Sequence, residues 1–121
     1  MNTKQPLFIS ALLFMFLLMG ISCSKSSDPA PAAPSGTTTN INILTMSYSA
    51  SPATVARGTV VKWTNTDGAA HTVTSNDAIS FDSGTINAGG TFSYTANVAG
   101  TFNYHCTIHG LAMSGVLVVN P

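Results

Sequence analysis

The stretch from Tyr104 to Met113 places a thiol, an imidazole and a thioether close together, on Cys106, His109 and Met113. A second imidazole, on His71, lies further upstream. Soft thiolate and thioether ligands favour Cu(I), whereas imidazole suits both oxidation states of copper. Two His, one Cys and a weak axial Met form the ligand set of a mononuclear copper site for electron transfer. A ligand set that suits both oxidation states needs little rearrangement when an electron arrives or leaves.

The spacing of these residues is compatible with one shared ion. Cys106 can end a strand, and a short loop can then return His109 and Met113 to the same place. His105 alternates with Cys106 along that strand, so its side chain should face away from the metal. The candidate ligands of one copper ion are therefore His71, Cys106, His109 and Met113. Zinc is an alternative when copper is scarce, although the affinity order favours copper over zinc.

The elements that must position these residues read as short β-strands from Ile41 onwards. Apolar and polar residues alternate with a period of two in 58–65, 90–95, 100–106 and 115–119, and Gly-containing turns separate the runs. No segment shows sustained helical periodicity. About seven or eight short strands in this length predict an all-β fold, a Greek-key β-sandwich. We expect Trp63 to belong to its core.

The first 40 residues have a different composition. Lys4 precedes an apolar run from Leu7 to Met19, which is typical of a signal peptide and short for a membrane span. We expect residues 1–22 to be this signal. Cys23 would be the lipidated first residue of a bacterial lipoprotein, and the Ser-, Pro- and Ala-rich residues 23–40 would form a flexible tether. An ordinary signal peptide with an incidental Cys23 is the alternative. The folded domain is predicted to span residues 41–121.

Composition limits the possible functions. Charged residues make up only 7% of the chain and the formal net charge is zero. Nucleic-acid binding is therefore not expected, because there is no basic patch to neutralise phosphates. With Cys23 lipidated, Cys106 has no partner for an intramolecular disulfide. A free thiol in an oxidising compartment is a liability unless something such as a metal occupies it.

Residues 41–121 resemble the plastocyanin/azurin family of cupredoxins. The resemblance lies in the segments Val61–Asn65, His71–Val73, Gly100–Cys106, His109 with Met113, and Gly115–Val119. It implies a β-sandwich with copper at one end, held by His71, Cys106, His109 and, weakly, Met113. It also implies that the backbone at Thr72 helps to hold the sulfur.

The resemblance further implies a function as an electron carrier without enzyme activity of its own. Electrons would enter and leave beside His109, through a surface that includes Gly110, Leu111 and Ala112. Transient redox proteins would dock there, such as a cytochrome or a copper or haem enzyme. We expect an exported monomer, lipid-anchored in the cell envelope or periplasm, with the outer membrane favoured over the inner.

One departure from the family pattern concerns the loop between the Cys and the second His. Plastocyanin-like loops usually carry Pro there, whereas this chain has Ile108. Ile108 keeps an N–H that Pro would lack. That N–H could point at the thiolate sulfur, where hydrogen bonds tune the reduction potential.

Three other functions remain open from the sequence. A copper storage or delivery module could use the same soft ligands without redox cycling. A subunit of a copper enzyme would need a second metal site, and only His105 is left to build one. In a purely structural adhesive domain, His71, Cys106 and His109 would not converge.

Overall fold

The computed structural model describes residues 36–121; the predicted signal segment and Cys23 lie outside the described residues. Eight strands make up this part of the chain: β1 (Thr38–Leu44), β2 (Ser47–Tyr48), β3 (Ala53–Ala56), β4 (Val60–Asn65), β5 (Thr74–Ser75), β6 (Thr91–Thr95), β7 (Gly100–Cys106) and β8 (Gly110–Asn120). No helix long and apolar enough to cross a membrane is found among these residues.

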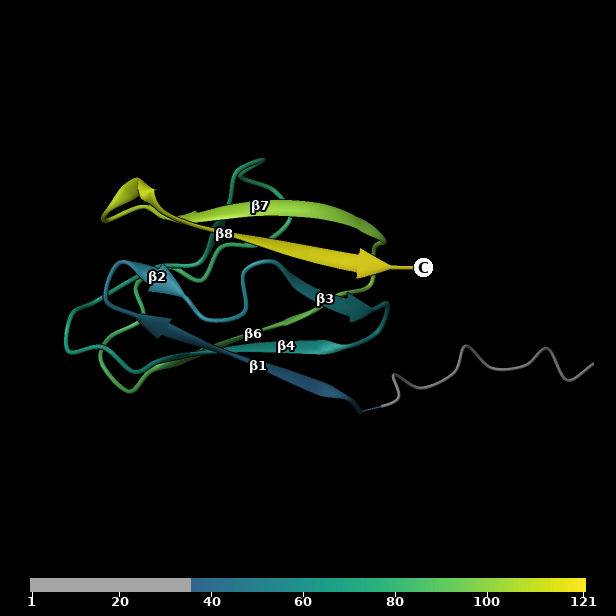
Figure 1. Ribbon diagram of the computed structural model, residues 1–121, viewed down its shortest axis with the longest axis horizontal. Coiled ribbons are helices and arrows are strands. Elements are labelled where there is room, and N and C mark those ends of the chain that lie inside the picture. Colours follow the sequence, from purple (N-terminus) through teal and green to yellow (C-terminus); the bar gives the residue numbers. More distant parts are fainter. Residues whose placement is uncertain (1–35) are drawn as a thin grey trace, which may run out of the picture.

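The strands form two four-stranded sheets that face each other (Figure 1). One sheet has the order β2-β1-β4-β6 and the other β3-β8-β7-β5. Both sheets are mixed, because β1 runs parallel to β4 and β3 runs parallel to β8. The predicted all-β sandwich is confirmed.

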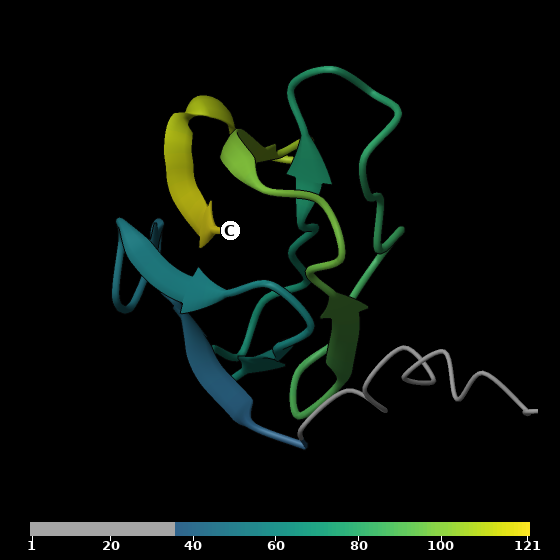
Figure 2. The same cartoon turned by 90° about the vertical axis from the view of Figure 1, so that its right-hand side faces the viewer.

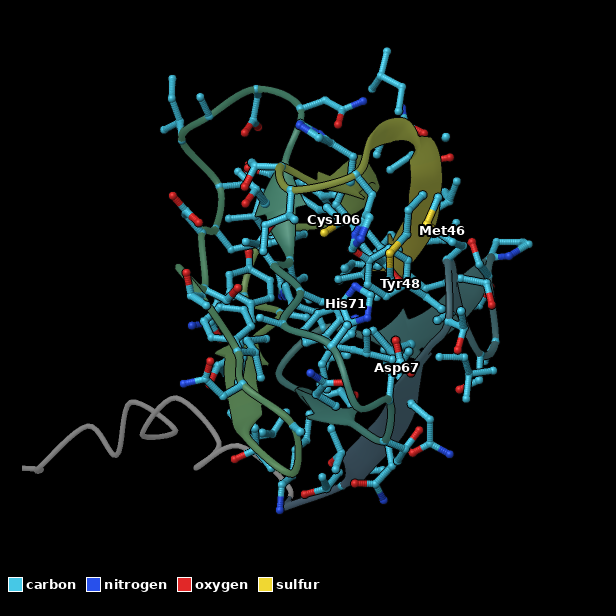
Figure 3. All side chains as sticks on the ribbon, turned by 90° about the vertical axis from the view of Figure 1, so that its left-hand side faces the viewer. Met46, Tyr48, Asp67, His71 and Cys106 are labelled. Atoms are coloured by element: carbon cyan, nitrogen blue, oxygen red, sulfur yellow. The ribbon has the colours of Figure 1, made fainter. Side chains whose placement is uncertain are left out.

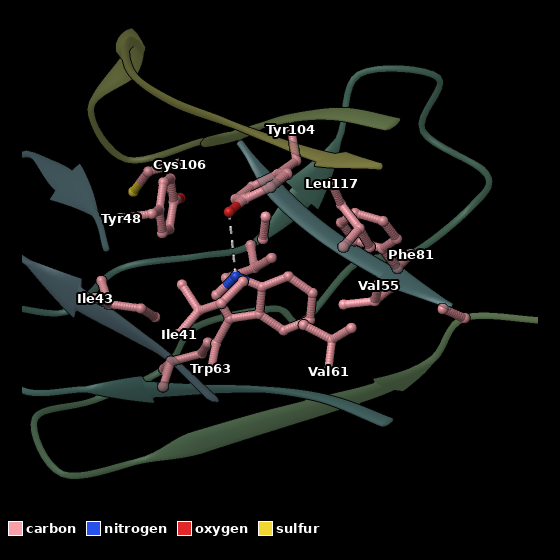
Figure 4. Packing of buried hydrophobic residues seen from close by; sticks show 14 of the residues in the cluster. Ile41, Ile43, Tyr48, Val55, Val61, Trp63, Phe81, Tyr104, Cys106 and Leu117 are labelled. Atoms are coloured by element: carbon pink, nitrogen blue, oxygen red, sulfur yellow. Dashed lines mark hydrogen bonds between the residues drawn. The ribbon is translucent and has the colours of Figure 1, made fainter. Parts of the chain in front are cut away.

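The core lies between the sheets and follows the alternation seen in the sequence. On β4, Val61, Trp63 and Asn65 are buried while their neighbours are partly exposed. Trp63 packs edge-on against Tyr104 of β7, with ring centroids 5.7 Å apart, and its Nε1–H donates to the Tyr104 hydroxyl over 3.4 Å (Figure 4). Trp63 is therefore a core residue, as predicted.

The two ends of the sandwich differ. β7 ends at Cys106 at one end, which we call the metal pole, and β1 begins at Thr38 at the opposite end, where the C-terminus also lies (Figure 1). Figure 2 looks onto that opposite end. β1 begins three residues before the predicted domain start at Ile41, because Thr38, Thr39 and Asn40 pair with Val60, Val61 and Lys62. These polar residues carry no apolar alternation, so only their pairing reveals them as strand.

Candidate metal centre

Three segments meet at the metal pole, onto which Figure 3 looks. His71 lies in the long connection between β4 and β5, Cys106 is the last residue of β7, and His109 lies in the turn before β8. The ladder between β7 and β8 shifts register between His105 and Cys106. Cys106 then pairs with Gly110, so the turn that carries His109 folds back over the end of its own strand.

The ligand atoms of His71, Cys106 and His109 all lie within 4.8 Å of one another. Cys106 Sγ is 3.3 Å from His109 Nδ1 and 3.8 Å from His71 Nδ1. An ion about 2.3 Å from a thiolate and about 2.1 Å from an imidazole nitrogen spans at most about 4.4 Å between the two ligand atoms. Both sulfur–nitrogen distances are within that reach, so Cys106 can share one metal ion with each of the two histidines.

The sulfur of Cys106 lies in a fully buried but polar surrounding. The Thr72 N–H donates a hydrogen bond to it over 3.4 Å, which confirms the contact expected at Thr72. Burial alone would raise the pKa of the Cys106 thiol, but the Thr72 N–H hydrogen bond and the contacts with the His109 and His71 rings lower this pKa to about 6. The thiolate, which is the form that binds metal, therefore prevails at neutral pH.

Thr72 also joins the two ligand-bearing segments to each other. Its Oγ1 accepts the Thr107 N–H over 2.8 Å and lies 3.2 Å from the Thr107 hydroxyl. Its carbonyl accepts the Tyr48 hydroxyl over 2.6 Å. Burial raises the pKa of Tyr48, so the phenol stays protonated and keeps donating. The Thr107 contacts hold the turn after Cys106 against the His71 segment, and the Tyr48 bond holds that segment against β2.

His71 is held from its far side by a carboxylate. Its Nε2 lies 2.8 Å from Asp67 Oδ2, and its side chain is 1% exposed. Burial lowers the pKa of His71, but the hydrogen bonds to Asp67 and Cys106 outweigh burial, so this pKa stands above its usual value. The same contact with His71, followed by the Gly68 N–H, lowers the pKa of Asp67.

Met113 lies on the inward face of β8, fully buried, in the stretch of that strand opposite the register shift at Cys106. Met113 directly precedes Ser114, which pairs with His105 at that shift. His105 is directed to Asn76 instead, with 2.7 Å between its Nδ1 and Asn76 Oδ1. The predicted docking residues Gly110, Leu111 and Ala112 are all exposed.

The expectation for Ile108 is wrong. Within residues 36–121, the one backbone N–H that donates a hydrogen bond to the sulfur is that of Thr72, and Ile108 makes no such bond. The reason is the tight turn, in which the His109 N–H folds back to 3.2 Å from the Cys106 carbonyl. The Ile108 side chain is exposed instead.

Two residues at the site were missed in the sequence. Asp67 stands before Gly68 in a pair typical of a turn, and a carboxylate four residues before a candidate ligand is also a usable signal. Tyr48 gave no signal, because its bond to Thr72 depends on how β2 is placed against a segment 24 residues away.

Comparison with known proteins agrees with this geometry. Residues 36–120 match the family of copper-binding proteins of the plastocyanin/azurin type. A Cu(I) form of an amicyanin variant is similar at 30% identity over 67% of this chain and 80% of its own, with a TM-score of 0.61. A reduced amicyanin variant is 27% identical over 71% of this chain and 84% of its own, with a TM-score of 0.63. No match was found among the curated proteins.

The fold, the convergent donor set and the family together are those of a type 1 copper electron-transfer protein with one copper ion. The chain belongs to the plastocyanin/azurin family of copper-binding proteins.

Proposed function

We propose that His71, Cys106 and His109, with Met113 as a weak fourth ligand, hold the copper ion, and that the protein shuttles single electrons between redox proteins of the cell envelope. The observation that supports this most is the convergence of a buried thiolate with the Nδ1 atoms of two histidines. When bound, copper supplies a one-electron couple between Cu(II) and Cu(I).

The protein's own contribution is to arrange the donors in advance. The lowered pKa of Cys106 favours its thiolate at neutral pH, and Thr72 holds both its sulfur and the turn that follows it. Asp67 fixes the ring of His71. Because these contacts are made between groups of the protein itself, the site should change little between oxidation states, which favours rapid electron exchange.

The partner would dock beside His109. This residue is partly exposed, whereas His71 is buried, so His109 is the ligand through which an electron can leave towards another protein. Leu111 and Ile108 beside it are 70% and 52% exposed. With Gly110 and Ala112 they form an uncharged surface, which suits a small transient interface with a cytochrome or another metal-containing redox protein.

The location follows from the N-terminal sequence and from where the domain begins. We infer that residues 1–22 are cleaved and that Cys23 carries the lipid that attaches a monomer to a bacterial membrane, with the outer membrane favoured. β1 starts at the end opposite the metal pole (Figure 1). A tether entering at Thr38 would leave the copper facing away from the membrane, open to partners in the aqueous phase.

Electron transfer is distinguished from copper storage by a combined redox and retention experiment. The copper-loaded protein is reduced with ascorbate and reoxidised with ferricyanide over repeated cycles, in the presence of a Cu(I) chelator. We expect one electron per copper in every cycle and retention of the metal throughout. Loss of copper to the chelator in the first reduced phase would instead indicate a storage or delivery module.

A further inference from the structure

Asp67 holds a place at the metal pole that the family match does not explain. We propose that Asp67 is a positioning residue that fixes His71 as an Nδ1 ligand and lowers the Cu(II)/Cu(I) reduction potential through its negative charge. This inference rests on the proposed function, because it assumes that His71 binds the copper.

The geometry of His71 leaves one orientation for the ring. Nε2 faces Asp67 Oδ2 at 2.8 Å, and Nδ1 faces Cys106 Sγ at 3.8 Å. The Asp67 carboxylate and the Cys106 thiolate can each only accept a hydrogen bond, but the carboxylate lies at 2.8 Å and the sulfur at 3.8 Å, so we place the proton of the neutral ring on Nε2. The lone pair of the neutral ring is then on Nδ1, the atom that faces the sulfur and the metal position.

The carboxylate is itself held on its other oxygen. Asp67 Oδ1 accepts the Thr45 hydroxyl over 3.1 Å and the Gly68 N–H over 2.8 Å. Oδ2 is thereby left for His71. Thr45 lies in the turn between β1 and β2, so this contact ties that turn to the loop that carries the ligand.

The loop around Asp67 is fixed by one buried side chain, Asn65. Its Oδ1 accepts the Asp67 N–H over 3.0 Å, and its Nδ2 donates to the carbonyls of Ala69 and Ile86 over 2.7 and 2.9 Å. The backbone on both sides of Asp67 is thus clamped. A carboxylate placed this firmly can orient the imidazole, as partners of metal-bound histidines generally do.

The two histidines are inequivalent in their surroundings. The Asp67 side chain is only 19% exposed, so its charge is partly shielded from water and acts on His71 at close range. In the described part of the chain, the one hydrogen-bond contact of the His109 ring is its Nδ1 with Cys106 Sγ.

A negative charge beside a ligand stabilises the more positive Cu(II) state, so it lowers the reduction potential.

The test compares Asp67→Asn with Asp77→Asn. The first keeps an oxygen that can accept from Nε2 but removes the charge. The second makes the same change of charge in a carboxylate that accepts hydrogen bonds from Ser75, Ile79 and Ser80 and not from a histidine. Reduction potentials are measured by spectroelectrochemistry on the copper-loaded proteins.

We expect Asp67→Asn to weaken Cu(II) relative to Cu(I) binding by about tenfold, which for one electron raises the potential by about 59 mV. Asp77→Asn should move it by much less. Equal shifts in the two variants, or no shift, would overturn the proposal. A wild-type protein with no thiolate–copper band would instead refute the proposed function itself.

A second measurement needs neither copper nor a variant. Nitrogen NMR of the copper-free wild-type protein, at a pH where the His71 ring is neutral, reports which ring nitrogen carries the proton. We expect the proton on Nε2 of His71. A proton on Nδ1 would refute the positioning role even if Asp67→Asn did not fold.

Discussion

At the scale of single residues, the candidate ligands are held by hydrogen bonds from neighbouring groups of the protein. Cys106 is the clearest case, since the Thr72 N–H bond and the contacts with His109 and His71 offset its burial and favour the thiolate at neutral pH. His71 and Cys106 lie far apart in the chain, yet the Thr72 N–H and side chain connect them directly. The properties of this copper site should therefore respond to changes in residues that never touch the metal.

The axial position can be tested by replacing Met113 with Leu. The two side chains have similar volumes, so we expect Met113→Leu to cost less than about 1.5 kcal/mol of stability. The thiolate–copper band should persist, because Cys106 and the histidines are unchanged. The reduction potential should rise, since Cu(II) loses a sulfur donor. An unchanged potential in spectroelectrochemistry would show that Met113 is only a core residue.

Asp77 should make the stability of the copper-free protein depend on acid. Hydrogen bonds from Ser75, and then from Ser80 and Ile79, hold its pKa below the usual value of 3.8. A carboxyl with a lowered folded-state pKa stabilises the protein above its unfolded pKa, and this contribution is lost as the pH falls.

The matched comparison for this effect is Asp77→Asn. Denaturant unfolding should find the variant less stable than wild type at neutral pH, and the difference should shrink below about pH 4. A difference that stays constant down to acid pH would contradict the role of this charge.

At the scale of the elements, β7 and β8 must approach each other closely beneath the metal site. Gly115 of β8 lies opposite Tyr104, and a Cβ at this position would come within 2.3 Å of the Tyr104 ring. Tyr104 cannot easily move away, because Trp63, Tyr48 and Phe81 pack against its ring (Figure 4). Position 115 therefore has no room for a side chain larger than that of glycine.

Substitution of Gly115 by Ala should destabilise the protein by about 1–3 kcal/mol through overpacking. Gly36→Ala is the matched control, because a Cβ there would meet nothing within 4 Å. Denaturant unfolding of the copper-free proteins measures both. If the two variants were equally stable, the close packing of β8 on Tyr104 would be refuted.

The strands also show which parts of the fold can be predicted from the sequence. The strands that carry apolar alternation, such as β4 and β7, could be predicted, and so could the type and spacing of the candidate ligands. The two-residue strands β2 and β5 are too short to show a period, and the first residues of β1 are polar. The spacing of Asp67 and His71 is a signal in the sequence, but their contact also depends on how Asn65 holds the loop after β4.

At the scale of the whole molecule, the two ends of the sandwich differ in structure, although the domain carries little charge. The charged residues among 36–121 are few: Arg57, Lys62, Asp67, Asp77 and Asp82. Electron exchange between two copies of the protein would bring their metal poles together. With so little charge, that encounter should depend only weakly on ionic strength.

The docking surface can be tested by electron self-exchange, which needs no other partner. Leu111→Glu places like charges on both approaching surfaces, so the rate measured by NMR line broadening should fall several-fold at low salt and recover partly at high salt. Val98→Glu is the control, because Val98 is 62% exposed but lies in the connection between β6 and β7, at the end where β7 begins. Equal effects of the two variants would contradict docking at the metal pole.

The central claim is that Cys106, together with His71 and His109, forms the copper site. The most direct test is a titration of the copper-free protein with Cu(II), followed by visible absorption and electron paramagnetic resonance. Cys106→Ala and His105→Ala are measured beside wild type. We predict an intense thiolate-to-Cu(II) band that saturates at one copper per chain, is lost in Cys106→Ala and persists in His105→Ala. A colourless wild-type protein, or a colour that survives in Cys106→Ala, would contradict the account.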